Sequence, residues 1–250
     1  MSGVIVESRG EIAVLRLSNG PANAIDLELV EALSAALKDA ARESRGVVLA
    51  GGQKLFSLGF DLPSLVQLDR PGFSHFFQAF NAVTLQLFSL PLPTCCAITG
   101  HAVAGGCILA MACDWRIAAP GKKIGLNEIK LGIPVPFLSD LILQEIVGSR
   151  AALSLAYGGE FLTAEEAAGI GLVDEQAEQG AVEARAFARV KGLVDHPAGA
   201  FAAIKAYRVE PVQQVYLMEH EARNQVFLDC WFSQASQAKL REAAEKFQAP

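Results

Sequence analysis

The sequence predicts an α/β fold, because short apolar runs of strand length alternate with helical segments along much of the chain. Several of these strand-to-helix junctions are marked by glycines. With 250 residues, 52% of them hydrophobic, the chain is long enough to bury a full core. In such folds ligands usually bind at the turns that follow the strands, so these junctions are the first places to look for a site.

The N-terminal segment is predicted to form a β-hairpin. Val4 and Val6 alternate with other residues, and residues 12–17 follow after a Glu-Ser-Arg-Gly-Glu turn. Apolar residues at helical spacing predict a helix over 27–41, and residues 47–50 form a short apolar run typical of a buried strand. The predicted order is therefore strand, strand, helix, strand.

A similar order recurs in the next segment. Residues 65–90 have helical spacing and many aromatic side chains, two prolines then break the helix, and residues 94–99 form an apolar run of strand length. The glycine-rich stretch GHAVAGG leads into an apolar helix at 107–113, and a strand is expected at 115–118. We infer that strands and helices continue to alternate here.

The second half of the chain is predicted to be mainly helical from Ser139 onward. Thr163 and Glu166 have the spacing of a capping box, in which each side chain bonds the other residue's backbone. The last segment keeps apolar residues at helical spacing and is too apolar for an independent solvated tail. We expect residues 1–196 to form the α/β catalytic core, and 197–250 a helical oligomerisation region.

Composition excludes several classes of protein. The formal charge is −6 with no Lys/Arg run, which argues against a nucleic-acid partner. The N-terminus lacks a basic region followed by an apolar one, and no stretch reaches the ~18 apolar residues of a membrane span. The five cysteines have no CxxC spacing, so we expect reduced core thiols, no metal site and a soluble, cytoplasmic protein.

Two glycine-marked turns are candidate ligand sites. In FSLGFDL (56–62), Gly59 permits a tight turn that leaves the amide of Phe60 facing a cleft, although a plain turn with Asp61 as helix cap also explains this motif. In GHAVAGG (100–106), free amides and the helix dipole favour developing negative charge. A nucleotide phosphate loop is the alternative, but the Lys-Ser/Thr pair of a P-loop is missing.

The third candidate is Glu128, within IGLNEIKLGIPVPF (124–137). It is a carboxylate in an otherwise apolar run interrupted by glycines and prolines. Desolvation there would raise its pKa toward the range that suits proton transfer near neutral pH. From this segment alone, a surface glutamate at a turn is the favoured interpretation.

In their order and spacing, FSLGFDL, GHAVAGGCILAMACDWRIAA and IGLNEIKLGIPVPF resemble the crotonase, or enoyl-CoA hydratase/isomerase, superfamily over nearly the whole chain. GEFLTAEEA at 159–167 and GLVD at 171–174 resemble its next segment, and Trp231-Phe-Ser with Lys246-Phe247 its C-terminal end. The resemblance implies a crotonase-type spiral of ββα units, a C-terminal helical trimerisation region, and a homotrimer or dimer of trimers.

The resemblance also implies the roles of individual residues. The backbone amides of Phe60 and Gly105 match an oxyanion hole that holds a thioester C=O as it becomes an enolate. Glu128 matches the acid-base carboxylate. The CoA-binding surface corresponds to two short segments, whose members are Asn23, Ala24, Ile25, Phe56 and Leu58. The implied ligand is an acyl-CoA substrate, with no separate cofactor.

The sequence departs from the hydratase pattern at one position. Hydratases of this family use two glutamates to hold and activate water, and the first would fall where this chain has Ile108. The amino-acid sequence around Glu128 most resembles that of mitochondrial-type 3,2-trans-enoyl-CoA isomerases, which have a lone glutamate. A single carboxylate favours moving a proton over adding water, so we expect isomerisation of 3-enoyl-CoA to 2-trans-enoyl-CoA.

Other residues with reactive side chains have simpler structural interpretations. Asp140 is expected to cap a helix, His101 and Cys107 to be structural, and Asp114 to pair with Arg116. Aromatic residues at helical spacing are expected in the core, with a partial role in lining an acyl site as the alternative: Phe73, Phe76, Phe77 and Phe80.

Two further functions stay open from the sequence. One is a hydratase or thioesterase-type hydrolase of the same superfamily, in which Glu128 alone positions water. The other is a noncatalytic acyl-CoA-binding subunit of a larger assembly. Hydration product or released CoA would reveal the first, and tight binding without turnover the second.

Overall fold

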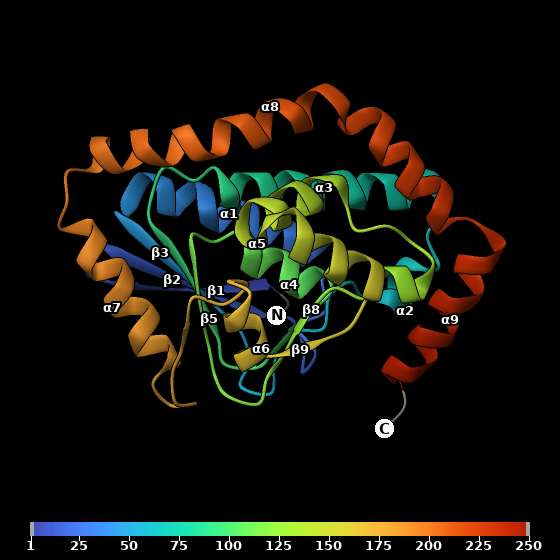
Figure 1. Cartoon of the computed structure of the whole chain (residues 1–250), viewed down its shortest axis with the longest axis horizontal. Coiled ribbons are helices and arrows are strands. Elements are labelled where there is room, and N and C mark those ends of the chain that lie inside the picture. The colour runs from blue at the N-terminus through green and yellow to red at the C-terminus, as the bar shows by residue number, and fades with distance from the viewer. Residues whose placement is uncertain (1–2, 249–250) are drawn as a thin grey trace.

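The computed structural model describes residues 3–248, with side chains described as far as Lys246. The similarity at Phe247 therefore lies outside the described side chains. Two β-sheets form the centre, and helices cover them on the outer sides (Figure 1). Of the two C-terminal helices, the first runs along the top of the view and the second lies at its right.

The predicted N-terminal elements are confirmed. Strands β1 (Gly3–Arg9) and β2 (Ile12–Ser18) form an antiparallel hairpin, and β3 (Gly46–Ala50) pairs with β2 in parallel. Between them lies α1 (Leu27–Glu43), which buries its apolar side against the sheet. The carboxylate of Asp26 caps this helix by accepting the Leu29 N–H at 2.8 Å.

Three successive turns of the chain then repeat the order strand, strand, helix. Their elements are β3, β4 (Leu55–Ser57), α2 (Leu62–Leu65) and α3 (Arg70–Phe88), then β5 (Thr94–Ile98), β6 (His101–Val103) and α4 (Gly105–Met111), then β7 (Trp115–Ala118), β8 (Lys123–Gly125), the short 3₁₀ helix η1 (Glu128–Leu131) and α5 (Phe137–Gly158). This order confirms the spiral of ββα units.

Each turn of the spiral contributes one strand to each sheet. The first strands join the six-stranded sheet β1-β2-β3-β5-β7-β10, and the second strands join the four-stranded sheet β4-β6-β8-β9. The two short closing strands are β9 (Leu162–Thr163) and β10 (Glu175–Gln176). Because β4, β6 and β8 run parallel, their carboxyl ends meet at the same edge.

The helix predicted over residues 65–90 begins only at Arg70, as α3, whereas Leu65 ends the short helix α2. Residues 66–69 between the two helices are not helical. Asp69 caps the start of α3, because its carboxylate accepts the Gly72 N–H at 2.8 Å. Pro71 follows in the first turn, where its missing N–H costs nothing. The apolar spacing continues through residues 66–69. The prediction therefore overlooked Asp69 and Pro71, which mark the start of a helix.

The C-terminal half has the predicted helices. They are α6 (Ala164–Gly169), with the Thr163–Glu166 capping box in place, α7 (Val182–Val194), α8 (Ala198–Trp231) and α9 (Gln234–Gln248). Helix α8 packs along α3 and α5, and α9 turns back against α2 (Figure 1). No helix within residues 3–248 has the length and apolar character needed to cross a membrane.

One predicted side-chain pair is wrong. Arg116 pairs at 2.8 Å with Asp174 instead of with the side chain of Asp114, whose carboxylate accepts hydrogen bonds from Thr94 and, at 3.0 Å, from Lys205 of α8. The partners lie far away in sequence, which is why the local pattern suggested the wrong pair. The five cysteines are free thiols, and four of them are buried.

Candidate active site

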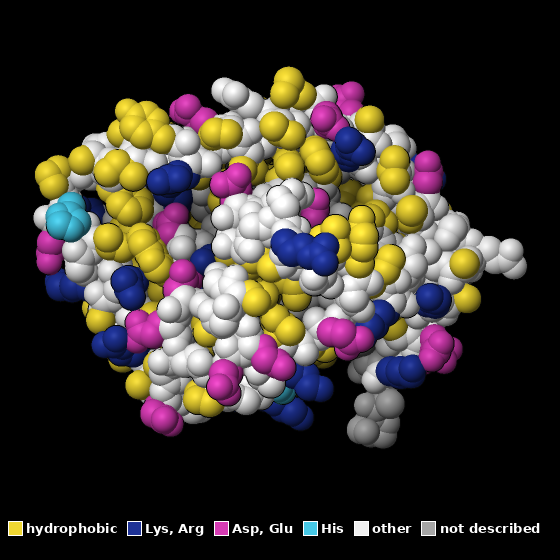
Figure 2. Space-filling view, viewed as in Figure 1, with side chains coloured by type: hydrophobic (Ala, Val, Ile, Leu, Met, Phe, Trp, Pro, Cys, Tyr) yellow, Lys and Arg dark blue, Asp and Glu magenta, His cyan; other side chains and the backbone are white. Residues whose placement is uncertain are grey.

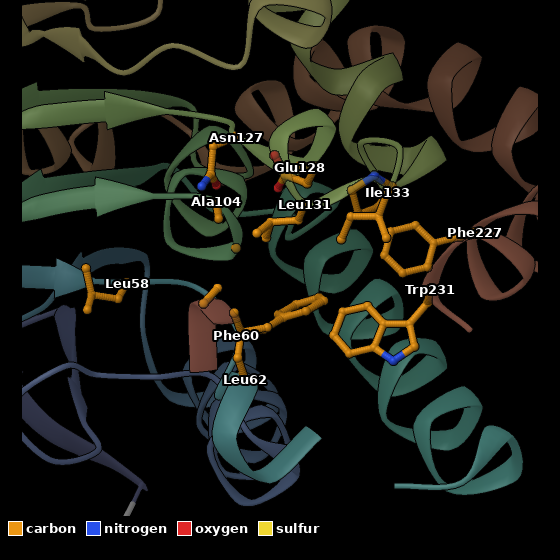
Figure 3. Close-up of a pocket in the computed structure, with 13 residues that line it drawn as sticks. Leu58, Phe60, Leu62, Ala104, Asn127, Glu128, Leu131, Ile133, Phe227 and Trp231 are labelled. Atoms are coloured by element: carbon orange, nitrogen blue, oxygen red, sulfur yellow. The ribbon is translucent and has the colours of Figure 1, made fainter. Parts of the chain in front are cut away.

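A pocket of about 90 Å³ lies at the carboxyl ends of β4, β6 and β8. Figure 3 shows it from the side, with Leu58 and Phe60 facing Asn127 and Glu128 across the cavity. The residues that line it are Leu58, Phe60, Leu62, Ala104, Gly105, Asn127, Glu128, Leu131, Ile133, Pro136, Phe227, Trp231 and Ala243. The structure thus brings all three predicted catalytic residues together.

The loop after β4 presents the amide of Phe60. Hydrogen bonds to Ile25 fix the two residues that flank Phe60. The Gly59 carbonyl accepts the Ile25 N–H at 2.8 Å, and the Asp61 N–H donates to the Ile25 carbonyl at 3.0 Å. Gly59 has φ +90°, a conformation that favours glycine. Within the described part of the chain, the Phe60 N–H between them has no hydrogen-bond acceptor.

The turn after β6 presents the amide of Gly105. Ala104 adopts φ +48°, and its own N–H donates to the Gly125 carbonyl at 2.8 Å. Gly105 is the first residue of α4, which has no side-chain cap, so its N–H has no acceptor within the helix. A Cβ added to Gly59 would lie 2.9 Å from the Gly105 nitrogen, which shows that the two turns are in direct contact.

Glu128 starts η1 and is buried, with 6% of the residue exposed. Burial raises the pKa of its carboxyl to about 7, although hydrogen bonds from the backbone of Glu128 and Asn127 lower it in part. Among residues 3–248, its Oε2 atom has no hydrogen-bond partner. This carboxyl therefore gains and loses a proton near neutral pH, and one oxygen is free to act on a ligand.

Several residues of the pocket were not predicted as site residues, and four of them are informative. Asn127 precedes Glu128, and its buried Oδ1 lacks a partner within the described chain. Because Asn127 is next to the candidate base in the sequence, its place in the pocket could have been predicted. Phe227, Trp231 and Ala243 come from α8 and α9, which we expected to serve only in docking and oligomer contacts. Nothing in their local sequence points to the pocket.

Four phenylalanines of α3 pack against residues that line the pocket and do not line it themselves: Phe73, Phe76, Phe77 and Phe80. The ring of Phe60 packs edge-on against Phe76 at 5.0 Å and Phe80 at 4.8 Å between centroids. Trp231 stacks on Phe73 at 3.9 Å. These four phenylalanines are therefore core residues, as expected, and they fix the position of three lining side chains, because Phe77 also stacks on Phe227.

Of the predicted CoA-binding residues, only Leu58 lines this pocket. The side chains of Ile25 and Phe56 are fully buried. The Asn23 side chain donates to the Phe56 carbonyl at 3.1 Å and accepts the Asn19 N–H at 2.9 Å, while Ala24 is half-buried. These contacts hold the two predicted segments side by side, so a ligand there would meet mainly backbone groups.

Glu128 is the one acid among the described residues that line the pocket. Ile108, at the position of the second hydratase glutamate, is buried in α4 and has no carboxyl group to offer. Asp140 lies in the first turn of α5, outside this pocket, and accepts a hydrogen bond from Gln144 at 2.8 Å. Glu128 is therefore the candidate for proton transfer in this pocket.

His101 and Cys107 have structural positions. The Nδ1 atom of His101 accepts the Lys123 N–H at 2.8 Å, joining β6 to the start of β8. Cys107 is fully buried in α4, and burial raises the pKa of its thiol to about 12, which keeps it protonated and a poor nucleophile. No cluster of three or more His, Cys, Asp or Glu side chains that could hold a metal occurs in residues 3–248.

The arrangement suits one type of chemistry. Two free amides, one in a loop and one at the start of α4, can stabilise a carbonyl oxygen as it becomes negative. A carboxylate with a pKa near 7 can remove a proton from the neighbouring carbon. Apolar walls keep water away from the resulting anion. Fold and site together define an enzyme of the crotonase type.

Comparison with known proteins supports the assignment to the crotonase type. The model of the family described as enoyl-CoA hydratase/isomerase matches residues 7–250. A probable enoyl-CoA hydratase of Mycobacterium avium is 34% identical over 78% of this chain and 77% of its own length. Mitochondrial enoyl-CoA delta isomerase 1 of Rattus norvegicus is 34% identical over 73% of this chain and 66% of its own length. The chain belongs to the enoyl-CoA hydratase/isomerase family.

Solved structures show the same fold. The crystal structure of human mitochondrial delta3-delta2-enoyl-CoA isomerase superimposes with a TM-score of 0.93 at 29% identity, covering 98% of both chains. An enoyl-CoA hydratase from Bacillus halodurans superimposes with a TM-score of 0.85 at 23% identity, covering 96% of this chain and 99% of its own. The similar proteins thus include both hydratases and isomerases.

Proposed function

We propose that this enzyme isomerises 3-enoyl-CoA to 2-trans-enoyl-CoA. The observation that carries the proposal is the single unpaired carboxylate, Glu128, in an apolar pocket that also holds the free amides of Phe60 and Gly105. An isomerase needs one group that takes a proton from C2 and returns it at C4. One carboxyl group is enough for both steps.

In the proposed mechanism the thioester oxygen accepts hydrogen bonds from the Phe60 and Gly105 amides. The charged Glu128 carboxylate removes a C2 proton, and the electron pair shifts to form a dienolate whose oxygen carries the negative charge. Each amide contributes roughly 3 kcal/mol to its stabilisation. The carboxyl then gives the proton to C4, the double bond forms between C2 and C3, and the base is restored.

Hydration is the competing reaction, and the similarity to a probable hydratase favours testing it. Adding water requires a second group that orients the water molecule, and Ile108 stands where the family's first glutamate would be. The isomerisation requires no water. The absence of a carboxyl group at position 108 therefore supports the isomerase.

The partition between these reactions tests the proposal. With purified wild type, we expect 3-hexenoyl-CoA to be converted to 2-trans-hexenoyl-CoA at least ~100-fold faster than 2-trans-hexenoyl-CoA is hydrated, since one acid-base group contributes about 10²–10⁴ in rate. Chromatography separates the acyl-CoA products and free CoA. Faster hydration, CoA release, or binding without any turnover would each reject the isomerase.

We further propose that the enzyme is a homotrimer or a dimer of trimers. Large apolar side chains are exposed along α8, among them Ile204, Tyr207 and Met218, the last two at 73% and 76% (Figure 2). Such a row on one helix is typical of a surface covered by another subunit. Light scattering is expected to give three or six times the 26.6 kDa chain mass, and a monomer at micromolar concentration would contradict it.

A further inference from the structure

Two side chains separate the Glu128 pocket from a second apolar cavity. Ile133 and Phe227 line both the pocket and a groove of about 330 Å³ between α5 and α8. Figure 3 shows them side by side at the end of the pocket farthest from Leu58. The groove continues beyond them past Val226 and Tyr157, both of which are exposed to solvent.

This wall is tightly packed. Ile133 is 3% exposed and Phe227 is 2% exposed. Phe227 stacks on Phe77 of α3 at 4.0 Å, and one helical turn further along α8, Trp231 stacks on Phe73 at 3.9 Å. A side chain held by stacked neighbours in a dense interior cannot swing aside without losing those contacts. The wall therefore stays closed when a ligand enters.

The closed pocket is small. Its volume of about 90 Å³ compares with the cavity of about 150 Å³ that accepts a benzene molecule in an engineered protein. By this measure the pocket has room for an acyl chain of about four carbons. Further methylenes would meet Ile133 and Phe227 instead of open space.

We propose that Ile133 and Phe227 determine acyl-chain length: they restrict the enzyme to short-chain acyl-CoA, and the groove behind them accepts the end of a longer chain once either side chain is shortened. This inference rests on the proposed acyl-CoA substrate. It also assigns the pocket-facing part of α8 a role in specificity, beyond the oligomerisation role that the sequence predicted.

Binding of saturated acyl-CoA tests the inference without requiring turnover. Calorimetry is expected to show that wild type binds hexanoyl-CoA at least ~10-fold more tightly than dodecanoyl-CoA. Ile133→Ala and the milder Phe227→Leu are expected to raise the dodecanoyl-to-hexanoyl affinity ratio at least ~10-fold, because each methylene that reaches an apolar wall adds up to about fourfold. Circular dichroism confirms that each variant is folded.

Val212→Ala is the matched control. It shortens a buried apolar side chain of the same helix, away from both cavities, and is expected to leave the affinity ratio unchanged. Equal binding of both ligands by wild type, or an unchanged ratio in both folded wall variants, overturns the inference. Chain-length discrimination without turnover of 3-hexenoyl-CoA upholds the inference but rejects the isomerase, whereas failure of wild type to bind either ligand rejects both.

Discussion

Glu128→Gln is expected to lose isomerase activity by about 10³ to 10⁴-fold, because the amide keeps the shape of the side chain but cannot accept the C2 proton. Asp140→Asn is the matched control. It neutralises an acid in the first turn of α5, outside the pocket, and is expected to retain activity. The measurement is kcat/KM with 3-hexenoyl-CoA, and comparable values for wild type and Glu128→Gln would remove Glu128 from the mechanism.

The titration of Glu128 determines how the activity of the wild-type enzyme depends on pH. The base must be charged to act, and burial places the pKa of Glu128 at about 7. We expect kcat/KM to rise with pH through about 7 and then to level off. The residual activity of Glu128→Gln should lack this rise, and a wild-type profile that is flat from pH 5 to 9 would contradict the assignment.

Glu128→Gln should also stabilise the folded protein above neutral pH. Between pH 4.5 and about 7 the unfolded chain loses the Glu128 proton while the folded chain keeps it, so wild-type stability falls as the pH rises across this range. Above pH 7 the deficit reaches roughly 3 kcal/mol. Denaturant unfolding at pH 8 should show the variant to be more stable by about that amount, and at pH 4 the two should be equal.

The three site residues that could be predicted from local sequence have one structural feature in common. Phe60, Gly105 and Glu128 each follow directly after a short strand of the four-stranded sheet, within two or three residues. Their positions depend on glycine-marked turns, which a sequence displays. Parallel pairing of the three strands then brings these turns together. The apolar runs alone did not predict these short strands, at 55–57, 101–103 and 123–125; only the resemblance to a spiral of ββα units implied them.

The residues that sequence could not reveal depend on long-range packing. Trp231 and Phe227 reach the pocket only because α8 runs the length of the molecule along α3, and Ala243 because α9 turns back against α2 (Figure 1). Apolar helical spacing shows that a helix buries one face, without showing what that face covers. The partners of Asp114 and Arg116, Lys205 and Asp174, were hidden for the same reason.

Gly59→Ala is expected to reduce kcat by about 10² to 10³-fold, although no catalytic side chain is changed. The added Cβ would lie 2.9 Å from the Gly105 nitrogen and 2.9 Å from the Ala104 Cβ, so the two turns must move apart. Separating the Phe60 and Gly105 amides removes their joint contact with the thioester oxygen. Loss of one such donor typically costs this factor.

Gly121→Ala separates this effect from backbone strain. Gly121 has φ +68°, so alanine there is also strained, yet an added Cβ meets no atom within 4 Å. We expect both variants to lose about 1–2 kcal/mol of stability from the strain, with activity retained in Gly121→Ala. Wild-type kcat in a folded Gly59→Ala protein would mean that the contact between the two turns does not set the oxyanion geometry.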